Sequence, residues 1–173
     1  MQLTGERIFL RQIEVTDAHV LFEQTQNETL RYLTGTTVTF SLEQIERHIL
    51  SIQADPKRFD FAICLNSGEI IGECSILDID AELKQAGFRI SMRALPWTGQ
   101  GYGTEAIACI IRFCFEELRL HQLELEVFSH NARAIAAYKK VGFDIVETIP
   151  DALLYDGVSF DEIIMRKRNP RVV

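Results

Sequence analysis

The sequence predicts an α+β (α/β-like) protein in which one mixed sheet carries helices on both faces. The chain has 173 residues, and its 47% hydrophobic content is enough for one core. Along the chain, segments whose apolar residues repeat with the period of a strand or of a helix follow one another in a clear order. A strand and two helices precede an antiparallel meander, which is followed by a helix, a strand, a helix and two strands. No linker, repeat or low-complexity segment interrupts this order, so residues 1–173 are predicted to form a single domain.

The N-terminal third is predicted to hold one strand and two helices. Residues 8–12 form a short apolar strand, and Thr16-Asp17 can cap a helix that runs to about residue 26. A second helix follows Ser41, because Ser41-x-x-Gln44 is the sequence of a capping box. Asp55-Pro56 ends that helix.

The middle of the chain is predicted to form the meander. Residues 59–65 and 69–79 are apolar runs joined around Asn66-Ser67-Gly68, which is a hairpin signal. Residues 88–92 form a third strand. We therefore expect three neighbouring antiparallel strands.

The last third alternates helices and strands. Residues 103–118 have the apolar spacing of a helix packed on a sheet, and residues 123–128 form the next strand. This strand should lie parallel to residues 88–92 by the right-handed crossover rule. Asn131 caps a further helix that ends at Gly142 in a left-handed conformation. Residues 143–149 and 159–165 are strands around the Asp156-Gly157 turn, which brings the sheet to about seven strands.

Charge and cysteine content exclude several classes of protein. The net charge of −7 argues against binding to nucleic acid or to an anionic membrane, because neither is attracted to an acidic surface. The four cysteines lie inside apolar runs without C-x-x-C spacing, so we expect buried free thiols and no metal site. The N-terminus has no basic segment leading into an apolar run, and no run reaches the roughly 18 apolar residues of a membrane span. These features predict a cytoplasmic protein.

Three alternate glycines mark a candidate phosphate site in Gly99-Gln100-Gly101-Tyr102-Gly103-Thr104. Glycine lets the backbone adopt positive φ, and the helix that follows directs free N–H groups toward an anion. A Walker loop is excluded because no glycine is followed by lysine. A dinucleotide fold is a closer alternative, since Glu126 follows where a ribose-binding acid belongs, but too little chain remains for its usual sheet.

A second motif, Asn131-Ala-Arg-Ala-Ile-Ala-Ala-Tyr138-Lys-Lys-Val-Gly142-Phe143, makes the prediction specific. Together with residues 98–103 it resembles the acyl-CoA-binding core of the GNAT N-acetyltransferases, and the element order is similar over nearly the whole chain. The Tyr-Gly-Thr-Glu-Ala run at 102–106 looks most like the RimJ/RimL-type (ribosomal-protein N-terminal) and polyamine acetyltransferase branch. The resemblance implies a GNAT fold with a central splayed parallel pair of strands.

The resemblance also implies that acetyl-CoA is the co-substrate, with its pantetheine arm between the two splayed strands. Thr98 stands where the family has Arg or Gln, so the pyrophosphate should depend mainly on the backbone amides of the glycine loop. Asn131 is either a helix cap or a cofactor contact. The implied cofactor-binding residues are Met92, Arg93, Thr98, Gly99, Gln100, Gly101, Tyr102, Gly103, Thr104, Asn131 and Tyr138.

Two residues are the catalytic candidates for direct attack of an amine on the thioester. The resemblance implies that Tyr138 stabilises the departing thiolate, although a core tyrosine is the plain alternative. Glu126 stands 12 residues before Tyr138, at the position of the glutamate that ribosomal-protein acetyltransferases use as base, but it can equally face solvent. Glu73 and Asp78 are secondary candidates for the base, as is a chain of water molecules that leads to bulk solvent.

The acceptor is predicted only by class. The resemblance implies a pocket formed by the first two helices, residues 78–84 and residues 151–160, whose acids would attract a cationic amine. Protein N-termini, polyamines, small amines and amino-sugar antibiotics remain open, and a homodimer is compatible with the family. The alternative function is a non-catalytic acyl-CoA-binding module of the same fold. The acidic residues in question are Glu23, Glu28, Glu43, Asp78, Asp80, Glu82, Asp151 and Asp156.

Overall fold

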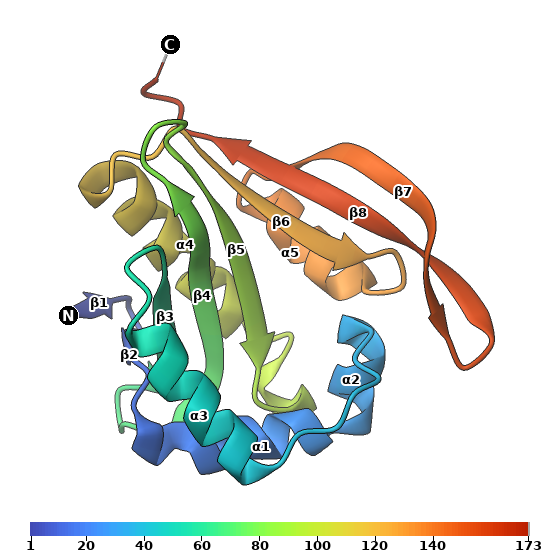
Figure 1. The fold of residues 1–173 in the computed structure, drawn as a ribbon. Coiled ribbons are helices and arrows are strands. Elements are labelled where there is room, and N and C mark those ends of the chain that lie inside the picture. The colour runs from blue at the N-terminus through green and yellow to red at the C-terminus, as the bar shows by residue number, and fades with distance from the viewer. Residues whose placement is uncertain (173) are drawn as a thin grey trace.

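The computed structural model describes residues 1–172, and its eight strands form one mixed sheet (Figure 1). The strand order is β1-β2-β3-β4-β5-β6-β8-β7, and every neighbouring pair is antiparallel except β5 and β6. The strands are β1 (Gln2–Thr4), β2 (Ile8–Gln12), β3 (Phe59–Leu65), β4 (Ile70–Asp80), β5 (Gln85–Met92), β6 (Gln122–Phe128), β7 (Asp144–Tyr155) and β8 (Val158–Arg168). The helices are α1 (Ala18–Gln26), α2 (Glu28–Thr34), α3 (Leu42–Gln53), α4 (Tyr102–Arg112) and α5 (Ala132–Lys140).

Helices cover both faces of the sheet, as the sequence predicts. The helices α1 and α3 lie on one face, where Ile45 and Ile49 of α3 pack with Ala62 and Cys64 of β3 (Figure 1). The helices α4 and α5 lie on the other face, over the larger core, to which each of the strands β2 to β6 contributes buried side chains. The alternation of side chains along each strand produces the two cores. None of the helices within residues 1–172 has the length and apolar composition needed to cross a membrane.

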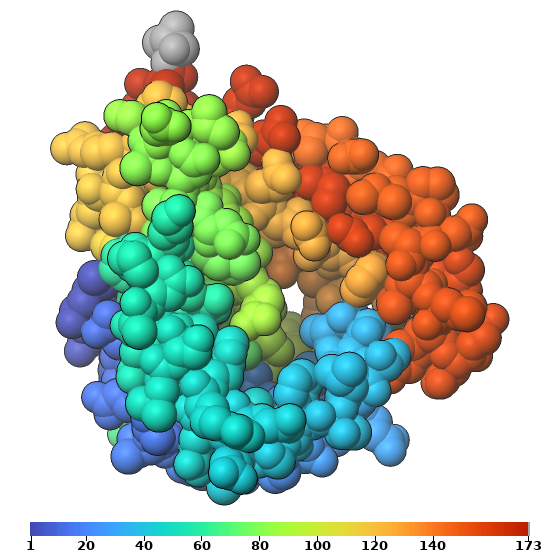
Figure 2. Space-filling view, in the orientation of Figure 1, coloured from blue at the N-terminus to red at the C-terminus, as the bar shows by residue number. Residues whose placement is uncertain are grey.

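The predicted parallel pair is confirmed, and its two strands diverge. The pairing of β5 with β6 covers only residues 85–87 and 122–124. Beyond this point β5 stays bonded to β4 as far as Met92, and β6 stays bonded to β8 as far as Phe128. Since each strand follows its outer neighbour, the sheet opens between them. Figure 2 shows the surface hollowed between β5, α2 and the hairpin of β7 and β8.

Several local predictions are confirmed by backbone geometry. Ser41 and Gln44 form the reciprocal bonds of a capping box at the start of α3. Asn131 caps α5 by accepting from the backbone N–H of Ala134, and Gly142 follows α5 with φ +97°. Asp17 precedes α1, but its carboxylate binds Arg11 at 2.8 Å and not the helix N-terminus.

The structure also differs from the prediction in ways that have local causes. The strand β1 and the helix α2 are too short for a periodic signal, although Asn27 caps α2 and Gly35 ends it with φ +66°. The predicted helix 103–118 ends at Arg112 and continues as a π-helical turn over Phe113–Glu117. The strand β7 runs on through Pro150, because this residue lies at the sheet edge where the pairing with β8 is irregular between Ile149 and Leu153. The sheet therefore has eight strands where about seven were expected.

Candidate functional site

A cavity of about 460 Å³ lies between β5, α2 and the N-terminal ends of α4 and α5. It brings together residues from segments that are far apart in the sequence, because the strand splay opens beside both helix N-termini. Eight of the eleven predicted cofactor-binding residues line it: Met92, Thr98, Gly99, Gly101, Gly103, Thr104, Asn131 and Tyr138.

The glycine loop presents one side to this cavity. Gly99 and Gly101 have φ of +72° and +85°, which only glycine adopts without strain, and both line the cavity together with Gly103. Gln100 and Tyr102 are not among the lining residues. Gly101 is the N-cap of α4, so the free amides and the positive dipole end of this helix are available to an anion. The loop has the geometry of a phosphate cradle.

Arg133 adds a cation to the loop that the sequence reasoning missed. Its guanidinium donates a hydrogen bond to Oγ1 of Thr98, while the Thr98 hydroxyl donates to the backbone oxygen of Leu95 at 2.6 Å. Arg133 also lines the cavity. The short side chain of Thr98 is therefore accompanied by a long donor from α5. The sequence signal was present, since Arg133 lies two residues after the predicted cap Asn131, but its use required knowing that the N-termini of α4 and α5 are adjacent.

Three predicted cofactor residues lie outside the cavity lining. Arg93 pairs with Glu23 at 2.9 Å and donates to the backbone oxygen of Ile70 at 3.2 Å. The carbonyl of Gln100 accepts from Arg7 at 3.1 Å, and the ring of Tyr102 lies 4.4 Å below the Arg7 guanidinium. Arg93 is thus bound to α1 and β4, whereas Gln100 and Tyr102 of the loop contact Arg7.

Asn131 has two separable polar atoms. Its side-chain oxygen accepts from the N–H of Ala134 at 3.4 Å and so caps α5. The amide nitrogen of the same side chain remains a donor at the cavity wall. Capping and cofactor contact therefore use different atoms, and the two expected roles are compatible.

Tyr138 lies on α5 with only 6% of its surface exposed, packed edge to face on Phe143. Burial raises the pKa of its phenol to about 12. The hydroxyl is therefore neutral at physiological pH, and a neutral phenol can donate a hydrogen bond.

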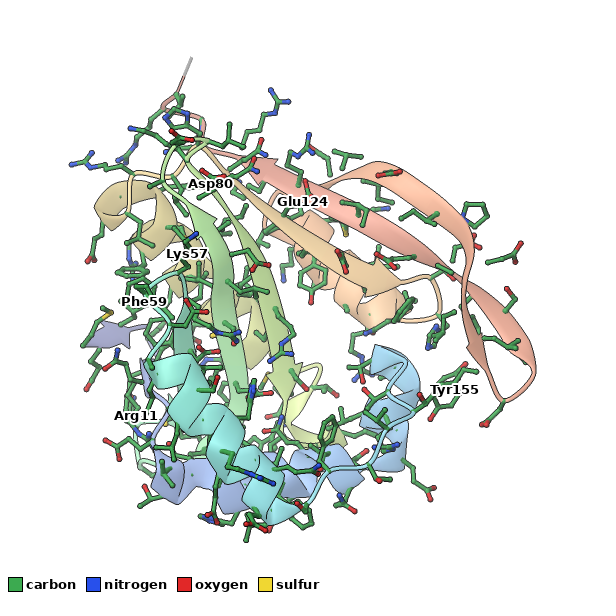
Figure 3. All side chains as sticks on the ribbon, in the orientation of Figure 1. Arg11, Lys57, Phe59, Asp80, Glu124 and Tyr155 are labelled. Atoms are coloured by element: carbon green, nitrogen blue, oxygen red, sulfur yellow. The ribbon has the colours of Figure 1, made fainter. Side chains whose placement is uncertain are left out.

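Glu126 lies in a second cavity of about 470 Å³, with Asp78, Arg89 and Glu124 among its lining residues. The strand alternation of β6 directs Glu124 and Glu126 to the face opposite the α4–α5 core, and Figure 3 shows Glu124 on this strand. Burial, together with repulsion from and a hydrogen bond with Glu162, raises the pKa of Glu126. The structure thus separates Glu126 and Tyr138 onto the two sides of the splay.

The secondary base candidates differ in position. Asp78 lines the second cavity, whereas Glu73 lines neither cavity. Loss of hydration raises the pKa of Glu73, and Arg89 partly opposes that shift.

The helix α2 supplies a wall that the sequence reasoning missed. Leu30, Leu33 and Thr34 line the main cavity with His130. Among residues 1–172, no acidic side chain lines this cavity, whereas Asp78, one of the acids expected around the acceptor, lines the second cavity. The Asn27 cap was the available sequence signal for α2.

His130 connects α2 to the β7–β8 hairpin. Its Nε2 lies 2.6 Å from the backbone oxygen of Tyr32, so this nitrogen carries the proton. The centroids of the imidazole and the Phe160 ring are 4.0 Å apart, with the rings tilted by 33°. Tyr32 in turn contacts Tyr155, which lies beside α2 in Figure 3. The wall formed by α2 is therefore held to the hairpin by aromatic contacts.

No group of three or more His, Cys, Asp or Glu residues within the described part of the chain is arranged to hold a metal ion. The four cysteines are free and buried, and burial raises the pKa of the Cys114 thiol. They are inert core residues.

Known proteins share this fold. Residues 7–144 match the model of an acetyltransferase (GNAT) domain. The SPbeta prophage-derived uncharacterized N-acetyltransferase YokL of Bacillus subtilis (strain 168) is 26% identical over 160 residues, covering 92% of this chain and 89% of that protein. Spermidine N-acetyltransferase from Vibrio cholerae, solved with CoA and spermine, has a TM-score of 0.87 at 20% identity and covers 94% of this chain and 95% of its own. A GNAT-family acetyltransferase from Bacillus anthracis has a TM-score of 0.83 at 16% identity, and the match covers 97% of this chain and 98% of that protein's chain.

Proposed function

The chain belongs to the GNAT acetyltransferase family, and from this premise we propose that it transfers the acetyl group of acetyl-CoA to a primary amine by direct attack on the thioester. The observation that carries the proposal is the single cavity that joins the glycine loop to Tyr138 at the strand splay. One space there can hold a phosphate at one end and a thioester at the other.

In this proposal the loop and α5 hold the pyrophosphate. The amides of the first turn of α4 and the guanidinium of Arg133 would donate to the phosphate oxygens, and the N–H₂ of Asn131 would donate nearby. Within residues 1–172, no strand pairs with the β6-facing edge of β5 beyond Gly87, so the main chain there can bond the pantetheine amides as an added strand would.

Tyr138 would stabilise the thiolate that leaves when the amine attacks. Full proton transfer from a phenol of pKa about 12 to an ordinary thiolate would be uphill by about 5 kcal/mol. A hydrogen bond from the neutral phenol to the sulfur is therefore the role we assign to Tyr138. As the carbon–sulfur bond breaks, the attacking nitrogen loses its second proton to solvent and the thiolate takes a proton from solvent.

Glu126 would act as the base on the opposite side of the splay. The amine approaches through the second cavity, where the raised pKa of Glu126 brings it closer to neutral pH than an ordinary carboxylate. An amine that arrives protonated gives its proton to this carboxylate and then attacks the carbonyl through the gap between β5 and β6.

The acceptor is a primary amine of a protein N-terminus, a polyamine or another small molecule. Asp78, Glu124 and Glu126 line the second cavity together with Arg89, and Arg166 pairs with Glu124 at 2.8 Å, so the acids still outnumber the guanidinium groups. This surplus of negative charge favours a cationic amine on that side. The Vibrio cholerae neighbour was solved with the polyamine spermine, which has the same charge character.

The test is thiol release from acetyl-CoA with ribosomal N-terminal peptides, spermidine and aminoglycosides as acceptors. Release with at least one amine, together with the acetylated product by mass spectrometry, supports the proposal. Binding of acetyl-CoA without release for any amine supports the alternative, a non-catalytic acyl-CoA-binding module. Failure to bind acetyl-CoA by calorimetry would contradict both.

A further inference from the structure

Arg7 reaches the glycine loop from the opposite side to the main cavity. It lies in the connection between β1 and β2, 93 residues before Gln100, and its Nη1 donates to the Gln100 backbone oxygen at 3.1 Å. Its guanidinium covers the Tyr102 ring at 4.4 Å. Arg7 therefore touches the two loop residues that face away from the cavity.

The bond to Gln100 determines where the next amide points. Residues 1–172 contain no cis peptide bond, so the carbonyl of Gln100 and the N–H of Gly101 point in opposite directions from one peptide plane. Because the carbonyl is held by Arg7, the Gly101 N–H is directed to the other side. Gly101 lines the main cavity, whereas Arg7 does not.

Glu105 completes this support. Its carboxylate accepts from both the backbone N–H and the Nε of Arg7, the latter at 2.9 Å. Partial burial alone would raise the pKa of Glu105, but the hydrogen bonds from Arg7 outweigh it and lower the pKa. A Cβ at Gly5 would lie 2.8 Å from Oε1 of Glu105, so this turn packs directly on the carboxylate. The negative charge in the first turn of α4 is thus drawn toward Arg7.

We propose that Arg7 is a positioning residue for the acyl donor: it orients the Gln100–Gly101 peptide so that the Gly101 amide faces the anion site. The inference rests on the proposed function, since it assumes a pyrophosphate at the loop. Arg7 makes no phosphate contact in this role. Arg7 should therefore strengthen the binding only of those acyl donors that carry the pyrophosphate.

The experiment compares three donors in the Arg7→Met variant, which keeps the apolar stem over Tyr102 and removes the guanidinium. For acetyl-CoA and for acetyl-3′-dephospho-CoA we expect Kd and KM to rise by the same factor of about ten, the worth of a hydrogen bond to a charged group. We expect kcat at saturation to be unchanged. For S-acetylpantetheine, which lacks the pyrophosphate, kcat/KM should equal that of the wild type. Arg47→Met, on the exposed side of α3, is the matched control and should change none of these values.

Three results would overturn the proposal. A smaller effect with the dephospho donor would mean that Arg7 binds the 3′-phosphate directly. An equal loss with S-acetylpantetheine would mean a general loss of structure, and unchanged binding of acetyl-CoA would mean that the amide needs no support. Failure of the proposed function is seen separately in the wild-type protein. If it binds acetyl-CoA but releases no thiol, the calorimetric comparison of donors still decides the role of Arg7. If it binds no acetyl-CoA, both are wrong.

Discussion

The guanidinium of Arg133 on α5 donates a hydrogen bond to the hydroxyl oxygen of Thr98, 35 residues earlier at the entrance of the glycine loop. This contact joins the two sequence motifs at one point. It brings a fixed positive charge to the loop, whose own leading residue is short and uncharged. An anion at the N-terminus of α4 would meet amides from one helix and a cation from the next.

Arg133→Ala should weaken acetyl-CoA binding by about 10- to 100-fold, the range for hydrogen bonds between charged groups. The measurement is Kd by calorimetry at constant ionic strength. Adding Thr98→Arg to this variant should recover part of the affinity, because it returns a guanidinium to the loop from the other side. An Arg133→Ala protein that binds acetyl-CoA like the wild type would contradict the assignment.

Tyr138→Phe should lower kcat by about 100-fold, the usual effect of removing one donor to a developing charge. Kd for acetyl-CoA and the melting temperature should stay the same, since the ring keeps its packing on Phe143. The pKa of about 12 means that the active, protonated form is lost only as pH rises toward that value. The wild-type rate should therefore show no loss from this group below pH about 11. An unchanged kcat in the Phe variant would leave Tyr138 as a core residue.

Glu126→Gln should reduce kcat/KM for the amine and remove the acid limb of the pH profile. The base works when ionised, so activity falls as pH falls through the pKa of Glu126, which lies above its ordinary value near 4.5. The profile is measured from pH 5 to pH 9 with one fixed amine. Glu147→Gln, on the exposed strand β7, serves as the control. An acid limb that persists in Glu126→Gln would assign the base to another group.

Gly101→Ala and Gly103→Ala should differ. A side chain at Gly101 would be held at φ +85° and would lie 3.1 Å from the Arg7 guanidinium, so the variant should lose about 1–2 kcal/mol of stability and bind acetyl-CoA more weakly. The nearest atom to a Cβ at Gly103 outside the backbone of α4 is Met92 Sδ at 3.8 Å among residues 1–172, an ordinary contact, and helical φ suits alanine. Its melting temperature should therefore be maintained or raised. Chemical denaturation and calorimetry measure both effects, and equal losses at the two positions would contradict this distinction.

Much of the fold could be predicted because its signals are local. The Ser41 capping box, the Asn131 cap and the left-handed Gly142 depend on residues within a few positions of each other. The parallel neighbour of β5 followed from the handedness of a crossover. The helix α2 was missed because its seven residues are too few to show a helical period. The π-helical turn after Arg112 was missed because an extra residue per turn does not change the pattern of an apolar run.

The sequence by itself determined the two motifs, the glycine loop and the Asn131–Phe143 segment, and through them the family and the residues at the two helix N-termini. Only the tertiary structure decided on which face of the sheet, and on which side of the glycine loop, each of these side chains lies. The path of β5 and β6 along their outer neighbours separates Glu126 from Tyr138, and sheet order brings Arg7 and Arg133 to opposite sides of Gly99–Gly101. These contacts join residues far apart in the chain, and their geometry depends on the packing of the whole sheet, which no local pattern contains.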